Sequence, residues 1–364
     1  MLYLAVVLFA AVLVLVGKLL LWSPGNPRLF LDDNGRLSAG SISEKTFIAI
    51  NGVKQGMFIK GKNVANPVLL YLHGGLPDYF LTQRYPIGLE DDFTVVWWEM
   101  RGSGLSYDPG APLESITTDQ LISDTLALTD YLRDRFDKER VYLMGHSGGT
   151  FIGLYAAARS PERYHAYIGV AQVSNQLESE MLAYEYMLEK FRAKGNTDMA
   201  RKLEAAAVTK AGGTPREYLS LRDTAMHSLG IGTTHNIKSV LTGIFLPSWR
   251  FPEYTLGEKV NLWRGKFQSG VSSIWDEMIT TDLTAEIVTL DVPTYFVSGI
   301  YDYTVNYTLA REFLEELEAP VKGFYTFQDS AHSPIFEEPE WMQQILQEDV
   351  LTGRNRLADD VSTS

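Results

Sequence analysis

The sequence predicts an α/β fold, in which a mainly parallel sheet with flanking helices carries an inserted helical cap and follows an N-terminal transmembrane helix. Three observations support this prediction. Short apolar runs typical of buried strands alternate with segments of helical periodicity, and such alternation favours a parallel sheet. Over residues 175–286 this alternation gives way to long helical stretches. Residues 1–22 are almost entirely apolar.

Composition and charge narrow the class of protein. The 364 residues carry a formal net charge of -13 without any cluster of Lys and Arg, which argues against a nucleic-acid partner. The chain has no cysteine, so disulfide bonds, thiolate metal sites and a cysteine nucleophile are excluded. No set of metal ligands stands out, and we predict neither a metal nor a cofactor. The sequence leaves the oligomeric state open.

The first 22 residues predict a retained membrane anchor. As a helix rising 1.5 Å per residue, about 20 apolar residues cross the hydrocarbon core of a bilayer. Lys18 can extend to the interface, and Trp22 suits that position. A cleaved signal peptide is the alternative, but no basic segment precedes the apolar run and no clear cleavage site follows it. We therefore predict a single-pass membrane protein. Lys18 and Arg28 lean toward a cytoplasmic body but leave the side of the membrane open.

The remaining elements follow in a regular order. Two β-rich runs on either side of the turn sequence NGVKQ predict a hairpin that opens the sheet. Further strands are predicted at residues 67–75, 93–100, 140–145, 164–173, 292–302 and 321–328, with helices at 118–136, after Ser147, at 308–319 and at 338–347. The predicted organisation is an anchor at 1–22, a linker at 23–44, a first part of the core at 45–174, the cap at 175–286, a second part of the core at 287–352 and a polar tail at 353–364.

A serine bracketed by glycines marks the change from one predicted strand to a helix. Ser147 lies within the sequence GHSGG, which has the form G-x-S-x-G. In a nucleophile elbow the glycines allow a tight turn that leaves the serine oxygen exposed above the edge of the sheet. The helix N-terminus that follows favours negative charge developing there. A plain glycine turn is the alternative, but the strand-to-helix context favours a nucleophile.

A serine nucleophile needs a base, and the base needs an acid that fixes its tautomer. Among the six histidines, His332 lies in a loop after the last predicted strand, at the edge where functional residues of parallel sheets gather. Asp302 follows the preceding strand at the same edge. Asp329 is the alternative acid, but a residue so close in sequence cannot readily reach the far ring nitrogen. His146 is expected to point away from the serine. We predict Ser147, Asp302 and His332 as the catalytic residues.

The oxyanion of an acyl-transfer reaction needs two backbone N–H donors. The segment YLHGGLPD ends the third predicted strand, where small residues let the main chain approach a substrate carbonyl. We predict one donor at Gly75 and the other at Gly148. His73 is expected to be a scaffold residue rather than a catalyst.

These motifs together resemble the α/β-hydrolase superfamily and, within it, the proline iminopeptidase branch. HGGLPD is similar to that branch's HGGPG motif, WWEMRGSGLS resembles DQRGSGRS, and GHSGGT occupies the place of GGSWGS. The resemblance covers about residues 45–347 and implies an α/β-hydrolase fold with the triad in the order serine, aspartate, histidine. The sequence departs from the branch's motifs at Leu76, Glu99, Met100, His146 and Gly148.

The resemblance implies a serine hydrolase that forms an acyl-enzyme on Ser147 and acts on a small acyl or peptide substrate. We expect a membrane-anchored, proline iminopeptidase-like aminopeptidase. A carboxylesterase or lactonase of the same fold is one alternative, and a non-catalytic envelope scaffold is another. Serine rather than aspartate at the elbow disfavours dehalogenase and epoxide-hydrolase chemistry.

The predicted cap supplies the candidates for substrate recognition. Its aromatic residues are expected mostly to pack within the cap, although some of them could line an apolar pocket: Tyr184, Tyr186, Trp249, Tyr254, Trp263 and Trp275. An aminopeptidase must also bind a free ammonium group, and the carboxylates available for this are Glu178, Glu180, Glu185, Glu253 and Glu277.

Overall fold

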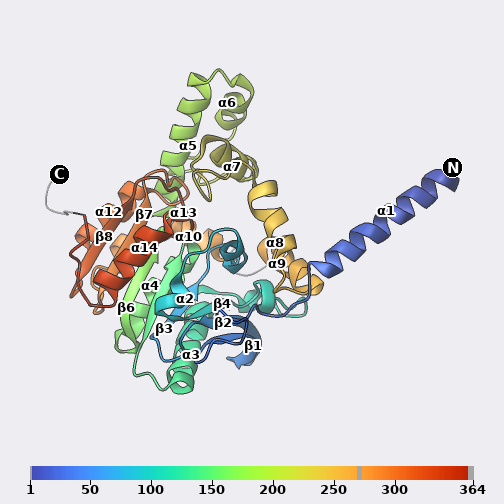
Figure 1. Ribbon diagram of the computed structural model, residues 1–364. Helices are drawn as coiled ribbons and strands as arrows, with labels where there is room; N and C mark the ends of the chain where they lie inside the picture. Colours follow the sequence, from blue (N-terminus) through green and yellow to red (C-terminus); the bar gives the residue numbers. More distant parts are fainter. Residues whose placement is uncertain (1, 269–272, 360–364) are drawn as a thin grey trace.

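One sheet organises the chain, which the computed structural model describes over residues 2–268 and 273–359 (Figure 1). In this part of the chain eight strands lie in the order β1-β2-β4-β3-β5-β6-β7-β8. The strands are β1 (Ile42–Ile50), β2 (Val53–Gly61), β3 (Val68–Leu72), β4 (Thr94–Glu99), β5 (Val141–His146), β6 (Tyr164–Val170), β7 (Thr294–Gly299) and β8 (Lys322–Phe327). From β4 to β8 every neighbouring pair is parallel, which confirms the predicted mainly parallel sheet.

The antiparallel hairpin that opens the sheet forms where the turn sequence predicts it. Ile50 pairs with Val53, so the turn consists of Asn51 and Gly52, with φ of 46° and 78°. Two successive residues with positive φ give a turn whose twist matches that of the strands, and Asn-Gly is the pair that adopts it most readily.

Helices cover both faces of the sheet, because alternate residues of each buried strand point to opposite sides. In β3, Leu70 and Leu72 belong to the apolar cluster that includes Phe151 of α4, whereas Leu69 belongs to the cluster that includes Met342 of α14. After the N-terminal helix α1 (Leu2–Leu21), the α-helices described outside the cap are α2 (Leu89–Asp92), α3 (Thr118–Phe136), α4 (Gly148–Arg159), α12 (Tyr307–Glu316), α13 (Pro334–Glu337) and α14 (Pro339–Ile345). The main predicted helices are therefore confirmed within a few residues.

The segment between β6 and β7, which we call the cap, is built of helices in its described part. These are α5 (Gln176–Ala193), α6 (Thr197–Glu204), α7 (Arg216–Leu229), α8 (Leu246–Arg250), α9 (Leu256–Gln268), α10 (Trp275–Thr280) and α11 (Leu283–Glu286). Figure 1 shows α5, α6 and α7 projecting beyond the sheet. These three helices pack around a separate apolar cluster that includes Met187, Leu203 and Tyr218. Residues 269–272 of the predicted cap and 360–364 of the predicted tail lie outside the described residues.

The predicted transmembrane anchor is wrong. Residues Leu2–Leu21 do form a helix, α1, which Figure 1 shows standing away from the rest of the chain. Among the described residues, however, no helix is both long enough and apolar enough to cross a membrane.

Trp22, one of the two residues expected at a membrane interface, contacts the cap. Lys259 of α9 donates hydrogen bonds to the carbonyl oxygen of Trp22 (2.6 Å) and to Ser23 Oγ (2.9 Å). The Trp22 ring also lies 5.7 Å from the guanidinium carbon of Arg250. The predicted membrane localisation is corrected together with the anchor.

Candidate active site

The turn between β5 and α4 holds Ser147 in a backbone conformation that few non-glycine residues adopt. Its φ is 56° and its ψ is −126°, and residues held in such sparsely populated regions cluster at functional sites. Two glycines make the turn possible. A Cβ at Gly145 would lie 2.7 Å from the carbonyl oxygen of Gly149, and a Cβ at Gly149 would lie 2.2 Å from the carbonyl oxygen of Leu72. The glycines of the motif are therefore required by close packing of main chain on main chain.

The loop after β3 passes directly beside Ser147. A Cβ at Gly74 would lie 2.8 Å from the Ser147 Cβ and 3.2 Å from its Oγ. Gly75 and Gly148 line the same cavity as Ser147. As the first residue of α4, Gly148 has no acceptor for its N–H within the helix. Ser147 Oγ makes no hydrogen bond to any described side chain or backbone group, so it stands open to this cavity.

Asp302 and His332 lie together at the carboxyl edge of the sheet, following β7 and β8. His332 Nδ1 is 2.9 Å from Asp302 Oδ2, and both side chains are buried. The other carboxylate oxygen of Asp302 accepts hydrogen bonds from the backbone N–H groups of Thr304 (2.8 Å) and Val305 (2.9 Å). Because Oδ1 is occupied in this way, the carboxylate is fixed with Oδ2 toward the imidazole. Asp329 makes no hydrogen bond to His332.

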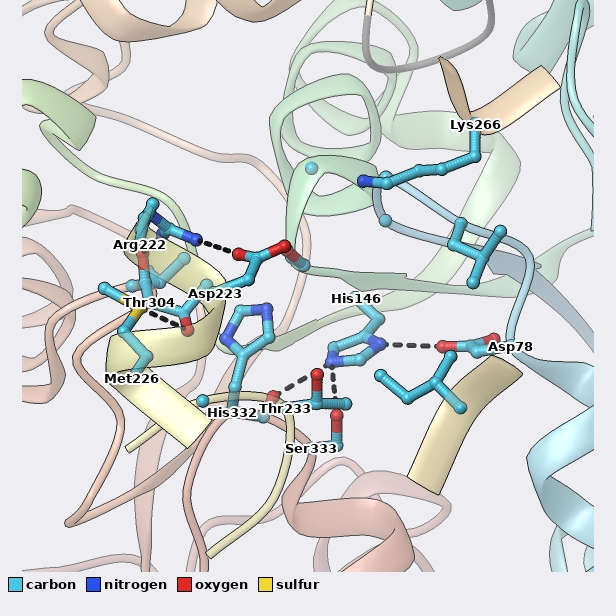
Figure 2. Close-up of a pocket in the computed structure, with 18 of the residues that line it drawn as sticks. Asp78, His146, Arg222, Asp223, Met226, Thr233, Lys266, Thr304, His332 and Ser333 are labelled. Atoms are coloured by element: carbon cyan, nitrogen blue, oxygen red, sulfur yellow. Dashed lines mark hydrogen bonds and ion pairs between the residues drawn. The ribbon is translucent and has the colours of Figure 1, made fainter. Parts of the chain in front are cut away.

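A second pair of an aspartate and a histidine lies beside the first. His146 Nδ1 is 2.8 Å from Asp78 Oδ2, and His146 Nε2 is 2.9 Å from the carbonyl oxygen of His332 (Figure 2). Both ring nitrogens face acceptors, so both must carry protons to donate. Burial lowers the pKa of His146, but the hydrogen bond and the charge of Asp78, followed by the His332 carbonyl, outweigh burial and raise this pKa above its usual 6.5.

Sequence reasoning missed this second pair. His146 is expected only to point away from the serine, yet it lines the same cavity as Ser147 and donates to the loop that carries His332. Asp78 also accepts a hydrogen bond from Tyr71 Oη at 2.8 Å, while its buried Oδ1 has no partner among the described residues. The available signal was the aspartate of HGGLPD, which follows the end of a strand as Asp302 does.

His73 has the surroundings of a structural residue, as expected. Its Nε2 accepts a hydrogen bond from the backbone N–H of Met100 (3.1 Å), so the proton lies on Nδ1, which donates to the carbonyl oxygen of Gly74 (2.6 Å). Burial lowers the pKa of His73 to about 4, and the ring is therefore neutral at physiological pH. This neutral ring joins the loop after β3 to the end of β4.

The cavity beside Ser147 has a volume of about 550 Å³, which is within the range of small-molecule sites. The core and the cap both contribute to its wall. Its polar residues from the cap include Arg222, Asp223 and Lys266 (Figure 2). Its apolar residues include Leu76, Phe80, Met226, Ile244, Trp263, Trp275 and Val305. Of the six cap aromatics considered, only Trp263 and Trp275 line this cavity.

None of the five glutamates considered as ammonium ligands lines the cavity. Glu180 is buried and bound by Arg222, with nitrogen to oxygen distances of 2.6 to 2.9 Å, and by Tyr218 Oη at 2.7 Å. Glu253 is buried elsewhere, against Lys60 and Tyr79. The carboxylates that do line the cavity are Asp78, Asp223 and Asp276. In the described part of the chain, no three His, Asp or Glu side chains come together as a metal ion would require.

The pKa of Asp223 shows that this carboxylate stays ionised. Burial raises the pKa, but the positive charges of Arg222 and Lys266, with a smaller influence of His227, lower it below its usual 3.8. Asp223 therefore presents a negative charge to the cavity at neutral pH.

Comparison with known proteins identifies the family to which this fold and site belong. Over residues 67–339 the sequence matches the alpha/beta hydrolase fold family, and the chain belongs to that family. Probable aminopeptidase YbaC of Bacillus subtilis (strain 168) is 31% identical over 306 residues, which cover 82% of this chain and 93% of that protein. Epoxide hydrolase 3 of Siraitia grosvenorii is 24% identical over 281 residues, which cover 74% of this chain and 85% of that protein.

Solved structures extend the comparison of the fold. Proline iminopeptidase from Mycobacterium smegmatis has a TM-score of 0.61 at 16% identity, and the alignment covers 85% of this chain and 98% of that one. The predicted resemblance to α/β-hydrolases of the proline iminopeptidase branch is confirmed. The comparisons likewise support a hydrolase enzyme rather than a non-catalytic scaffold.

Proposed function

We propose that this hydrolase is a serine enzyme with Ser147 as nucleophile, His332 as general base and Asp302 as the residue that orients His332. One observation carries the proposal. Ser147, in a strained turn between a strand and a helix, shares a cavity with His332, and the Nδ1 of that histidine is 2.9 Å from a buried carboxylate. This combination of geometry and roles is how the triad is recognised on unrelated folds.

The reaction proceeds in two halves. His332 Nε2 takes the proton of Ser147 Oγ as the oxygen bonds to the acyl carbon, and the N–H groups of Gly75 and Gly148 hold the oxyanion. His332 then gives the proton to the leaving group as the bond to the acyl carbon breaks. Water attacks the acyl-enzyme in the same manner and releases Ser147. Asp302 orients His332 and stabilises the imidazolium that forms.

An aminopeptidase is the activity that we favour. Hydrolysis of an aminoacyl amide with a free amino group requires a carboxylate near the triad. Asp223 lines the cavity and, although its Oδ1 lies 3.2 Å from Arg222 Nη1, it is less buried than Glu180. The relative named as a probable aminopeptidase supports this choice. A carboxylesterase or lactonase remains the alternative, because the apolar part of the wall would also hold a plain acyl chain. Serine at the elbow disfavours epoxide hydrolysis, which in this superfamily begins from an aspartate.

Labelling with a fluorophosphonate tests the nucleophile. We expect the purified protein to take up the probe and Ser147→Ala to lose the label. Ser220→Ala is the matched control, since Ser220 is exposed on the cap and absent from the cavity wall. Labelling of Ser147→Ala at the wild-type level would refute the assignment.

Substrate comparison tests the aminopeptidase proposal. Proline and alanine arylamides with a free amino group should be cleaved with a higher kcat/KM than the same amides with a blocked amino group. Short-chain aryl esters serve as the reference for general acyl transfer. If the free amino group brings no advantage, the aminopeptidase proposal fails and the esterase alternative is favoured.

A further inference from the structure

One cation in the wall of the cavity has no ion-pair partner among the described residues. Lys266 lies near the end of α9, and Figure 2 shows its side chain extending from that helix toward the middle of the cavity. Among residues 2–268 and 273–359, no hydrogen bond or ion pair reaches its Nζ. The lysine is only partly exposed, so its charge is not fully hydrated either.

The neighbouring cation is already neutralised. Arg222 binds both carboxylate oxygens of Glu180, at 2.8 Å through Nε and at 2.6 Å through Nη2. Its Nη1 also lies 3.2 Å from Asp223 Oδ1. Two carboxylates therefore surround this one guanidinium, so Arg222 would attract an anionic ligand only weakly. Lys266 is left as the cation available to such a ligand.

The electrostatics of Lys266 agree with this geometry. Burial lowers its pKa, and the charge of Arg222 acts in the same direction, while Asp223 opposes both. The charge of Lys266 in turn lowers the pKa of His73, the residue before the Gly74 loop that passes beside Ser147. An anion bound next to Lys266 would stabilise the charged form of this lysine, which burial destabilises.

We propose that Lys266 binds a carboxylate of the substrate, so that the enzyme acts on small amino-acid derivatives that carry both a positive and a negative charge. This inference rests on the proposed serine-hydrolase function. The acidic side chains Asp223, Asp276 and Asp78 also line the cavity, so its wall offers both signs of charge. A dipeptide with two free termini has this charge pattern. An amino acid with an acidic side chain in the acyl position has it as well.

Two pairs of substrates distinguish these sources of the carboxylate. The first pair is alanyl-alanine and alanyl-alaninamide, which differ only in the charge of the leaving group. The second pair is glutamyl and glutaminyl arylamides, which differ only in the charge of the acyl side chain. The wild-type enzyme should prefer the acid over its neutral partner in one pair by about 10- to 100-fold in kcat/KM, the range typical of a hydrogen bond to a charged group.

Variants at one position of α9 test the role of the lysine. Lys266→Met should reduce that preference to about one, whereas Lys266→Arg should retain most of it because the charge remains. Because each preference is a ratio within one variant, a general loss of activity does not affect it. Arg264→Met is the control, since it removes a positive charge from an exposed position of the same helix and should leave the ratio unchanged.

The outcomes separate this inference from the function on which it rests. A preference for the acid in either pair that disappears in Lys266→Met supports the proposal and identifies which carboxylate is bound. No preference in either pair, or a preference that survives in Lys266→Met, overturns it. If the wild-type protein neither takes up the fluorophosphonate nor cleaves any of the four substrates, the proposed serine-hydrolase function itself has failed.

Discussion

The two walls of the cavity are built in different ways. The wall from the core consists of loops at the carboxyl ends of parallel strands. Close main-chain packing fixes Ser147 and the Gly74 loop, and two backbone N–H groups fix Asp302 of the Asp302–His332 pair. The wall from the cap consists of side chains on α7, α9 and α10, and ion pairs across the cap decide which charges remain available. The first wall holds the groups that we propose to react, and the second holds those that we propose to recognise the substrate.

This difference explains why the largest expected effects come from the core. Asp302→Asn preserves the shape of the side chain but removes the charge that fixes the tautomer of His332. We expect kcat to fall by about 10⁴-fold, as replacement of this carboxylate by an amide does in serine triads. Steady-state kinetics on an arylamide measure the change. Asp329→Asn is the control, because Asp329 is the alternative acid and lies in the loop that carries His332. A comparable loss of kcat in Asp329→Asn, with Asp302→Asn unaffected, would reverse the assignment.

The elbow also depends on packing that a single methyl group would disturb. In Gly149→Ala the new Cβ would lie 2.2 Å from the carbonyl oxygen of Leu72 and 2.6 Å from that of His73, both of them main-chain atoms. We expect a loss of about 3 kcal/mol in the free energy of unfolding, at the upper end of the usual cost of overpacking. Urea unfolding measures it. In Gly257→Ala the new Cβ would meet nothing within 4 Å, so this variant should be as stable as the wild type.

The contrast between the walls also sets what the sequence could predict. The strands, the elbow serine and the Asp302–His332 pair follow from short patterns, because glycines, strand ends and chain order act locally. The pairing of Asp78 with His146 joins the loop after β3 to the end of β5, and no local pattern encodes it. The glutamates considered as ammonium ligands do not line the cavity, and this too depends on contacts between distant parts of the chain. Glu180 is consumed by Arg222, which lies 42 residues further along the chain.

The N-terminal helix shows the opposite error, in which a local pattern was given too much weight. The apolar residues of 1–22 predict a span, but no described helix meets the requirement for crossing a membrane. The hydropathy of a segment carries no information about its contacts with distant parts of the chain. The contacts that Lys259 makes to Trp22 and Ser23 join residues more than 230 positions apart and could not be foreseen from it.

On the cap side we expect a smaller effect, confined to substrates with a free amino group. Asp223→Asn removes a carboxylate whose pKa is lowered by Arg222 and Lys266 against the effect of burial, and so removes a full negative charge. The kcat/KM for a free aminoacyl arylamide should fall about tenfold, as expected for one charge-assisted contact at a partly exposed group. The N-blocked amide should change much less. Asp198→Asn, on an exposed turn of α6, is the control. Equal losses on the free and the blocked amide would show that Asp223 does not bind the amino group.

The smallest expected effect concerns the contact between the core and the cap at Glu99, one of the positions where the sequence departs from the family motif. Its carboxyl group is buried, is hydrogen bonded to Tyr254 Oη of the cap, and accepts a hydrogen bond from the backbone N–H of Leu105. Burial raises its pKa from 4.5 to about 8, although both hydrogen bonds oppose the shift. The folded protein therefore holds a proton that the unfolded chain releases.

This proton makes stability depend on pH in a definite direction. The contribution of protonated Glu99 is complete below pH 4.5, the pKa of the unfolded chain, and is lost as the pH rises to about 8. Glu99→Gln keeps the size of the side chain and an oxygen acceptor but has no titratable proton. Its Tm should accordingly fall less than that of the wild type between pH 5 and pH 8, by a few degrees. Glu337, whose pKa burial raises to about 7, keeps part of the dependence in both proteins. Parallel Tm curves for the two proteins over this range would show that Glu99 is ionised in the folded state.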